Sequence, residues 1–127
     1  MVHNILVLDD SEGMLKLLAY WLEHAGYSVT TTANPREGLA ILRSRQCDLL
    51  ILDIMMREMN GLELLAQLRA DEATSGIPVM LISGSKKYRD IAPAERLLFD
   101  DFLAKPFERE AFLGRVEAAL GKVWSPI

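Results

Sequence analysis

The sequence holds only one cysteine among its 127 residues, so the chain forms no internal disulfide bond. We interpret Cys47 as a small buried hydrophobe ahead of a strand rather than as a reactive thiol. Basic residues are also few: 14 lysines and arginines stand against 18 aspartates and glutamates, without a basic stripe, which disfavours nucleic acid as a direct partner.

The first apolar run, 5–8, is stopped by Asp9 and Asp10, which argues against a signal peptide. No run approaches the ~18 apolar residues of a membrane span. We therefore expect a cytoplasmic protein without a membrane partner.

The composition is that of an ordinary globular domain, with 50% hydrophobic and 25% charged residues. A chain of this size buries enough surface for a core that needs no disulfide or structural metal. We expect one domain over residues 1–122 and a short tail over 123–127. A stand-alone protein fits this length better than a domain cut from a longer chain, although both remain open.

Short apolar runs alternate with segments of helical periodicity along the chain. We expect strands at 5–8, 27–32, 49–52, 79–82 and 100–104, with helices at about 11–25, from 34, from 61, at 90–98 and at 107–120. Such alternation predicts a parallel sheet covered by helices on both faces. The runs at 5–8, 49–52 and 79–82 are apolar throughout, as central strands are. This places the other two strands at the edges and predicts a flavodoxin-like doubly wound α/β fold of strand order 2-1-3-4-5.

Pro93 falls inside the segment expected to form the fourth helix. Mid-helix proline removes a hydrogen bond and clashes with the preceding turn, at a cost of about 3 kcal/mol. The helix is therefore expected to be short, to begin near Asp90 or Ile91 with Asp90 as its cap, and to hold Pro93 in its first turn. Residues 85–89 are expected to form an irregular, mobile loop before it.

Ionisable and hydroxyl side chains stand at the carboxyl ends of four strands, where ligands bind in such sheets. They are Asp9 and Asp10 after the first strand, Asp53 after the third, Ser83 after the fourth and Lys105 after the fifth. Three neighbouring carboxylates repel one another, and a hard divalent cation such as Mg²⁺ relieves that repulsion.

With Mg²⁺, Ser83 and Lys105 would surround a phosphoryl group. The chain has no glycine-rich phosphate loop, so the phosphate is expected on a side chain rather than on a nucleotide. Asp53 is the candidate nucleophile, forming an aspartyl phosphate.

The strings LVLDDSE, DLLILDIMMREMNGLELL, PVMLISG and DDFLAKPF resemble those of receiver domains of two-component response regulators. The spacing agrees as well, with 43 residues from Asp10 to Asp53, 30 from there to Ser83 and 22 more to Lys105. The resemblance covers residues 3 to 120. It implies a phosphorylation-dependent switch that takes its phosphoryl group from a sensor histidine kinase or a histidine phosphotransfer protein and then binds a protein target. Such a domain acts as a monomer or a weak homodimer and catalyses only its own phosphorylation and dephosphorylation.

The resemblance also implies roles for particular residues. Asp53 would accept the phosphoryl group, while Asp10 would ligate Mg²⁺ directly and Asp9 largely through water. The main-chain carbonyl of Met55 would complete the metal's protein ligands. Ser83 would hydrogen-bond the phosphoryl group after activation.

Lys105 would pair with that group, and its peptide bond to Pro106 would be cis. Phe102 matches the family's switch aromatic, although the position is equally that of an edge-strand core residue.

The chain departs from the family pattern at three places. Arg57 stands where the family usually has proline, and we interpret it as a solvated loop side chain or, alternatively, as a kinase or phosphate contact. Leu98 and Phe99 occupy the stretch that usually holds a glycine before the fifth strand, and Pro93 lies in the fourth helix. The last two put the usual output surface in doubt.

Three other classes of function compete with this interpretation. A pseudo-receiver would be an interaction module that is never phosphorylated, which the intact acidic set disfavours. A phosphatase of the haloacid dehalogenase type needs a second carboxylate two residues after its nucleophile, where this chain has Met55. A flavin-binding relative would meet repulsion between its phosphate and the acidic strand ends.

Overall fold

The protein is described over residues 2–121 by a computed structural model that contains five strands and five α-helices. The strands are β1 (Asn4–Leu8), β2 (Ser28–Thr32), β3 (Leu49–Asp53), β4 (Val79–Ser83) and β5 (Asp101–Ala104). The helices are α1 (Glu12–His24), α2 (Pro35–Ser44), α3 (Gly61–Ala70), α4 (Pro93–Arg96) and α5 (Arg109–Leu120), and a single 3₁₀ turn spans Tyr88–Asp90. All neighbouring strands pair in parallel in the order β2-β1-β3-β4-β5, which confirms the predicted fold class.

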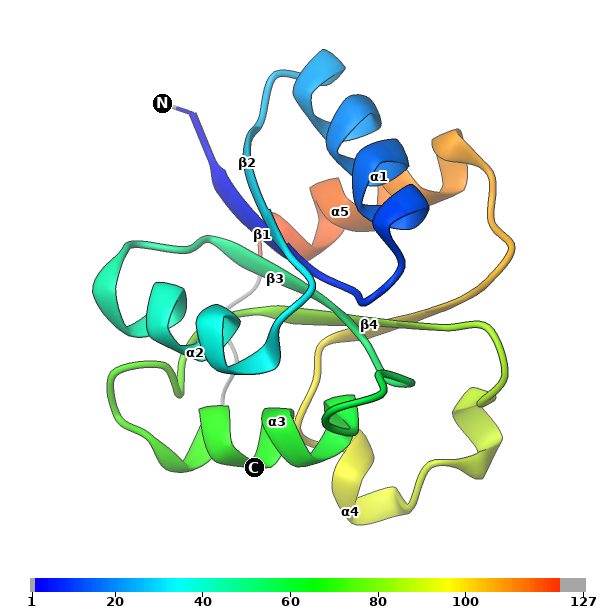
Figure 1. Cartoon of the computed structure of the whole chain (residues 1–127). Helices are drawn as coiled ribbons and strands as arrows, with labels where there is room; N and C mark the ends of the chain where they lie inside the picture. The colour runs from blue at the N-terminus through cyan, green and yellow to red at the C-terminus, as the bar shows by residue number, and fades with distance from the viewer. Residues whose placement is uncertain (1, 122–127) are drawn as a thin grey trace.

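The helices divide between the two faces of the sheet, with α1 and α5 on one face and α2, α3 and α4 on the other (Figure 1). Side-chain direction alternates along each strand, so every central strand supplies both faces. In β1, Ile5 and Val7 pack under α1 and α5, whereas Leu6 and Leu8 pack under α2 and α3. The runs 5–8, 49–52 and 79–82 of the three central strands are therefore apolar on both faces, because they lie between two separate cores.

Side chains just before α1 and α2 cap the starts of these helices. The Ser11 hydroxyl accepts from the Met14 amide, and the Asn34 side chain accepts from the amides of Arg36 and Glu37. Gly26 follows α1 with φ of 95°, a conformation that L side chains rarely adopt. These local signals fix where α1 and α2 begin and how β1 and β2 connect.

The region of α4 follows the prediction in part. Pro93 occupies the first turn of a helix of only four residues, so the prediction of a short helix is correct. Its start is wrong by two to three residues, and Asp90 does not cap it. Ala92 is the cap residue, because the proline after it holds its backbone extended at ψ of 140°. Tyr88 and Arg89 of the predicted loop form a 3₁₀ turn together with Asp90 instead.

The remaining corrections are small. β5 begins at Asp101 rather than at residue 100, because the Asp100 carboxylate turns back to accept from the Val79 amide at 2.8 Å. α5 begins at Arg109 because Glu108 before it is extended. In β2, Thr32 is buried and Thr31 is exposed, because Thr32 lies under Gly38 of α2. The predicted 123–127 tail lies outside the described residues.

No helix within residues 2–121 has both the length and the apolar character needed to cross a membrane.

Candidate functional site

Three carboxylates and one ammonium group meet at the carboxyl ends of the strands. Each of Asp9, Asp10 and Asp53 has a carboxylate oxygen within 4.8 Å of the other two. Asp9 and Asp10 directly follow β1 and Asp53 is the last residue of β3, and β1 and β3 pair side by side. The parallel register thus brings together residues that are 43 positions apart.

Asp9 is held rigidly because both of its oxygens have partners. Oδ1 accepts from the Ser11 amide at 2.9 Å, and Oδ2 lies 2.9 Å from the ammonium nitrogen of Lys105. Asp9 is fully buried and the Lys105 side chain is 18% exposed. A buried charge needs such a partner to offset its desolvation, so the pair of Asp9 and Lys105 is held in place at the buried side of the site.

Asp53 lies next to the same ammonium group but is held less tightly. Its Oδ1 is 3.7 Å from Nζ of Lys105 and accepts from the Met55 amide at 3.4 Å. The pKa of Asp53 is raised to about 6, mainly by burial and next by the negative charge of Asp9, against the opposing effect of Lys105. Its ionised form is destabilised in the folded protein, which is the condition that a bound cation relieves.

Asp10 lies at the rim of this group and is bound by Arg57. Its Oδ2 accepts from the Arg57 amide at 2.9 Å and lies 3.4 Å from that residue's Nε. The three carboxylates, two of them buried, form a set of hard oxygen donors of the kind that holds Mg²⁺. The residues therefore fit a divalent cation.

Ser83 is buried at the end of β4, one residue beyond the position that pairs with Asp53. Its hydroxyl oxygen accepts from the Lys86 amide at 2.9 Å, and its carbonyl accepts from the Lys105 amide at 2.7 Å. Ser83 thus connects the site both to the β4–α4 connection and to β5. The peptide bond between Lys105 and Pro106 is cis, as the resemblance implies.

Gly61 allows α3 to start directly behind Asp53. A Cβ atom at this position would lie 2.8 Å from Cα of Ile54 and closer still to the Asp53 carbonyl oxygen. The Gly61 amide donates to the Ile54 carbonyl at 2.7 Å, and the Asn60 side chain caps the helix. This contact fixes the loop that carries Met55, whose side chain is 51% exposed.

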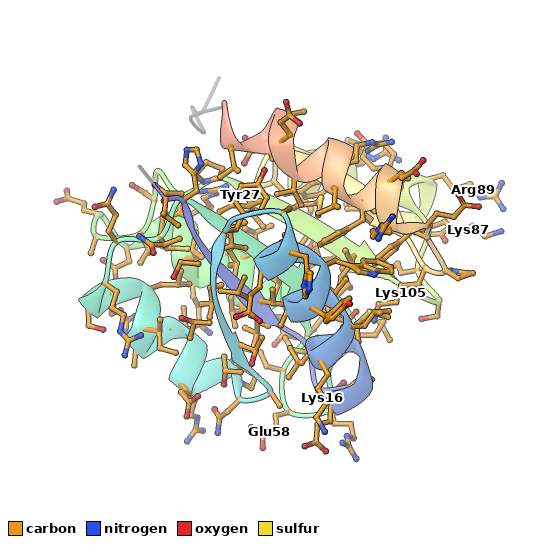
Figure 2. All side chains as sticks on the ribbon, turned by 90° about the horizontal axis from the view of Figure 1, so that it is seen from above. Lys16, Tyr27, Glu58, Lys87, Arg89 and Lys105 are labelled. Atoms are coloured by element: carbon orange, nitrogen blue, oxygen red, sulfur yellow. The ribbon has the colours of Figure 1, made fainter. Side chains whose placement is uncertain are left out.

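Phe102 lies in β5 behind the site, half-buried against the core under α3 and α4. Its ring makes edge contacts with Tyr88 at 5.9 Å and lies 6.5 Å from the ring of Phe99. Arg96 covers the other side of Tyr88 at 4.5 Å and donates to the Tyr88 carbonyl. Lys87 and Arg89, on either side of Tyr88, extend outward from the ribbon (Figure 2).

Sequence reasoning missed two features of this region. The first is the Tyr88 ring over Phe102, for which no periodic signal exists in a loop. The second is a buried ion pair between Arg69 of α3 and Asp100, 3.5 Å apart, which anchors the start of β5 at the far end of the sheet. Its signal was available, since Arg69 lies four residues after the buried Leu65 on the same helix face.

Of the remaining residues singled out from the sequence, Cys47 is half-buried and its thiol contacts the Leu49 carbonyl. Burial raises the pKa of that thiol to about 11, which agrees with an unreactive side chain.

Comparison with known proteins gives a consistent result. A family model described as the response regulator receiver domain matches residues 5–117. The chain is 33% identical over 117 residues to protein PilH of Pseudomonas aeruginosa, covering 92% of this chain and 97% of that protein. It is 34% identical over 117 residues to the transcriptional regulatory protein GlrR of Escherichia coli, covering 92% of this chain and 26% of GlrR. Among solved structures, the chemotaxis response regulator CheY4 of Vibrio cholerae superimposes with a TM-score of 0.85 at 26% identity, over 94% of this chain and 99% of that one.

The matched proteins differ in their total length. The chain spans between a quarter and about half of most of the curated relatives, including GlrR and the regulator RpaA of Synechocystis, and nearly all of PilH.

Proposed function

This chain belongs to the response regulator receiver domain family, and we propose that it is a phosphorylation-dependent signalling switch with Asp53 as its phosphoacceptor. The observation that carries the proposal is the position of the Asp53 carboxylate, within 4.8 Å of two further carboxylates and 3.7 Å from the Lys105 ammonium group. Such an arrangement places a nucleophile, donors for a metal and a fixed positive charge around one point.

The reaction transfers a phosphoryl group from a phosphohistidine of a sensor kinase or a phosphotransfer protein. An oxygen of the ionised Asp53 attacks phosphorus, the phosphorus–nitrogen bond breaks, and the imidazole nitrogen leaves with its electron pair. A bound Mg²⁺ supplies charge neutralisation for the attacking carboxylate and the transferring oxygens. Asp9, Asp10, Asp53 and the Met55 carbonyl are the proposed ligands.

Lys105 serves as the second positive group. Its ammonium nitrogen is held 2.9 Å from Asp9, so the charge is already in place before the phosphoryl group arrives. A preorganised cation stabilises developing negative charge without a reorganisation cost. Lys105 would then pair with the phosphoryl oxygens on Asp53.

Ser83 is the proposed link between phosphorylation and the partner-binding surface. Its hydroxyl oxygen accepts from Lys86 in this structure, and donation of its hydrogen to a phosphoryl oxygen would turn the hydroxyl toward Asp53. The β4–α4 connection would respond because it begins after Ser83, and Phe102 in β5 would respond because its ring contacts Tyr88 of that connection. The target is expected to be a protein that reads this changed surface.

The deciding experiment is incubation with a small phosphodonor such as acetyl phosphate and MgCl₂, followed by intact mass measurement. We expect one added phosphoryl group in the wild type and in Glu58→Gln, where Glu58 is an exposed acid that lines a hollow with Asp10. We expect none in Asp53→Asn. Modification that persists in Asp53→Asn would contradict the assignment, and a wild type that stays unmodified would indicate a pseudo-receiver.

Asp10→Asn separates metal binding from the acceptor role. The substitution removes one negative charge from the metal ligands but leaves Asp53 in place, so Mg²⁺ binding should weaken and phosphorylation should slow strongly. Calorimetric titration with MgCl₂ measures the first effect. Unchanged Mg²⁺ affinity in this variant would remove Asp10 from the proposed ligands.

A further inference from the structure

Arg57 binds the rim carboxylate of the acidic site with two different donors. Its main-chain amide lies 2.9 Å from Oδ2 of Asp10, and its Nε lies 3.4 Å from the same atom. Arg57 follows Asp53 by four positions, and both its neutral main-chain amide and its positively charged guanidinium face the same oxygen of Asp10. The site has two cationic neighbours, Lys105 and Arg57.

The two cations differ in how firmly they are held. Lys105 is mostly buried and pairs with the fully buried Asp9, so its charge stays in the site. The Arg57 side chain is 87% exposed, and the Asp10 side chain is 23% exposed. An exposed ion pair of this kind is weak and is screened by salt. The guanidinium can therefore leave Asp10 for solvent at little cost.

A metal ion at this site competes with Arg57 for the same carboxylate. Mg²⁺ requires a near-octahedral arrangement of oxygens, so Asp10 must be free to turn a lone pair toward it. While the guanidinium lies 3.4 Å from Oδ2, its charge repels the incoming cation and its hydrogen bond occupies a lone pair of that oxygen. The balance between these two cations sets how much Mg²⁺ the site needs.

We propose that Arg57 is a positioning residue that holds Asp10 in the metal-free protein and thereby lowers the Mg²⁺ affinity of the site. The inference rests on the proposed function, because it concerns the metal that the phosphoryl transfer requires. With Arg57 present, the site fills at higher Mg²⁺ concentrations than it would with the carboxylates alone. Phosphorylation of Asp53 then depends on Mg²⁺ over that same range.

Arg57→Ala provides the direct test, since it removes the guanidinium and keeps the main-chain amide. Calorimetric titration of the metal-free proteins with MgCl₂ alone should show that Arg57→Ala binds Mg²⁺ about two- to fivefold more tightly than the wild type at low ionic strength. This is the range expected for loss of an exposed ion pair. The increase should shrink as potassium chloride is added, because the pair is screened. Arg57→Lys keeps the charge and should retain most of the low affinity.

Arg36→Ala is the matched control. Arg36 lies in the first turn of α2 and lines a neighbouring hollow with Glu58 and Met59. Among the described residues, 2–121, its guanidinium forms no ion pair with Asp10. It changes the net charge by the same amount and should leave Mg²⁺ affinity close to that of the wild type. A thermal melt of each variant checks that the fold is unchanged.

Two results would overturn this proposal while leaving the proposed function standing. Equal Mg²⁺ affinity in Arg57→Ala and wild type would show that the pair does not compete with the metal. An equal gain in Arg36→Ala would assign the effect to net charge instead of to Asp10. Failure of the proposed function is distinguishable, because it appears as normal Mg²⁺ binding without phosphorylation of Asp53. Absence of Mg²⁺ binding in every variant would overturn both.

Discussion

The hydroxyl oxygen of Ser83 accepts a hydrogen bond from the main-chain amide of Lys86 at 2.9 Å. This bond ties the end of β4 to the connection that carries Tyr88. Because Tyr88 contacts Phe102, the Ser83 hydroxyl lies at the start of a short path from the acidic site to β5. The hydroxyl hydrogen of Ser83 is not used in this bond and is available for donation.

Ser83→Ala should uncouple this path while leaving the chemistry intact. The variant retains Asp53 and the carboxylates, so acetyl phosphate should still modify it, while the phosphorylation-dependent NMR shift of the Phe102 ring should become small. Loss of the buried hydrogen bond should cost about 1 kcal/mol of stability. Ser85→Ala, at an exposed neighbouring position, is the control and should behave as wild type. Equal Phe102 shifts in wild type and Ser83→Ala would refute the path.

The stability of the metal-free protein should depend on the ionisation of Asp53. Its pKa is raised to about 6 in the folded protein, so between about pH 4 and pH 6 the folded state holds more protons than the unfolded chain. The contribution of Asp53 to stability therefore falls as pH rises through this window. Asp53→Asn should remove the penalty, gaining up to about 3 kcal/mol near pH 8 and little near pH 4.

Urea unfolding in the presence of a chelator measures this difference at both pH values. Glu58→Gln removes an exposed charge nearby and should show no such pH-dependent gain. Addition of MgCl₂ should bring the wild type closer to Asp53→Asn, because ligand binding to the folded state stabilises it. A gain in Asp53→Asn that is the same at both pH values would contradict the assigned cause.

Two glycines offer a comparison of close contact and open space. Gly61→Ala places a methyl group against the Asp53 and Ile54 backbone and should destabilise the fold by about 1–3 kcal/mol while disturbing Mg²⁺ binding. Gly114→Ala lies within α5 with no atom near the new methyl group, so it should stabilise by about 1 kcal/mol through helix propensity. Urea unfolding of both proteins gives the sign of each effect. A neutral Gly61→Ala would show that α3 can shift away from β3.

The ion pair between Arg69 and Asp100 should be essential to the fold. Arg69 also donates to the carbonyls of Leu98, Ser75 and Ile77, and only 4% of its side chain and 9% of that of Asp100 are exposed. Arg69→Met leaves a buried carboxylate without its cation and should cost about 3–5 kcal/mol.

The exposed pair of Arg43 and Asp71 is the matched control. It spans 2.8 Å with side chains 53% and 31% exposed, so Arg43→Met should cost less than about 1 kcal/mol. Similar losses in Arg43→Met and Arg69→Met would show that burial does not decide the strength of these pairs.

Strand positions and the acidic site were predictable because each depends on a local pattern. Continuous apolar runs identify β1, β3 and β4, and the parallel order then brings Asp9, Asp10 and Asp53 to one edge. The positions of the site residues therefore follow mostly from the strand order and the parallel register.

The contacts that could not be predicted depend on tertiary packing. Arg57 was interpreted as a solvated side chain or a phosphate contact; it is solvated for most of its length and meets Asp10 through its amide and Nε. Whether Thr31 or Thr32 is buried depends on which face of the edge strand β2 receives α2. The start of α4 was misplaced because a proline limits where a helix begins without determining which residue caps it.

The one-turn α4 leaves the corner between β4 and β5 weakly packed. From residue 84 to residue 98 only Ile91 is buried, and the start of β5 is held separately by the bond between Asp100 and Val79. Insertions or deletions in this corner would add only a small loop-closure cost and would leave the register of β4 and β5 unchanged. The length of this corner can thus change without altering the residues of the acidic site.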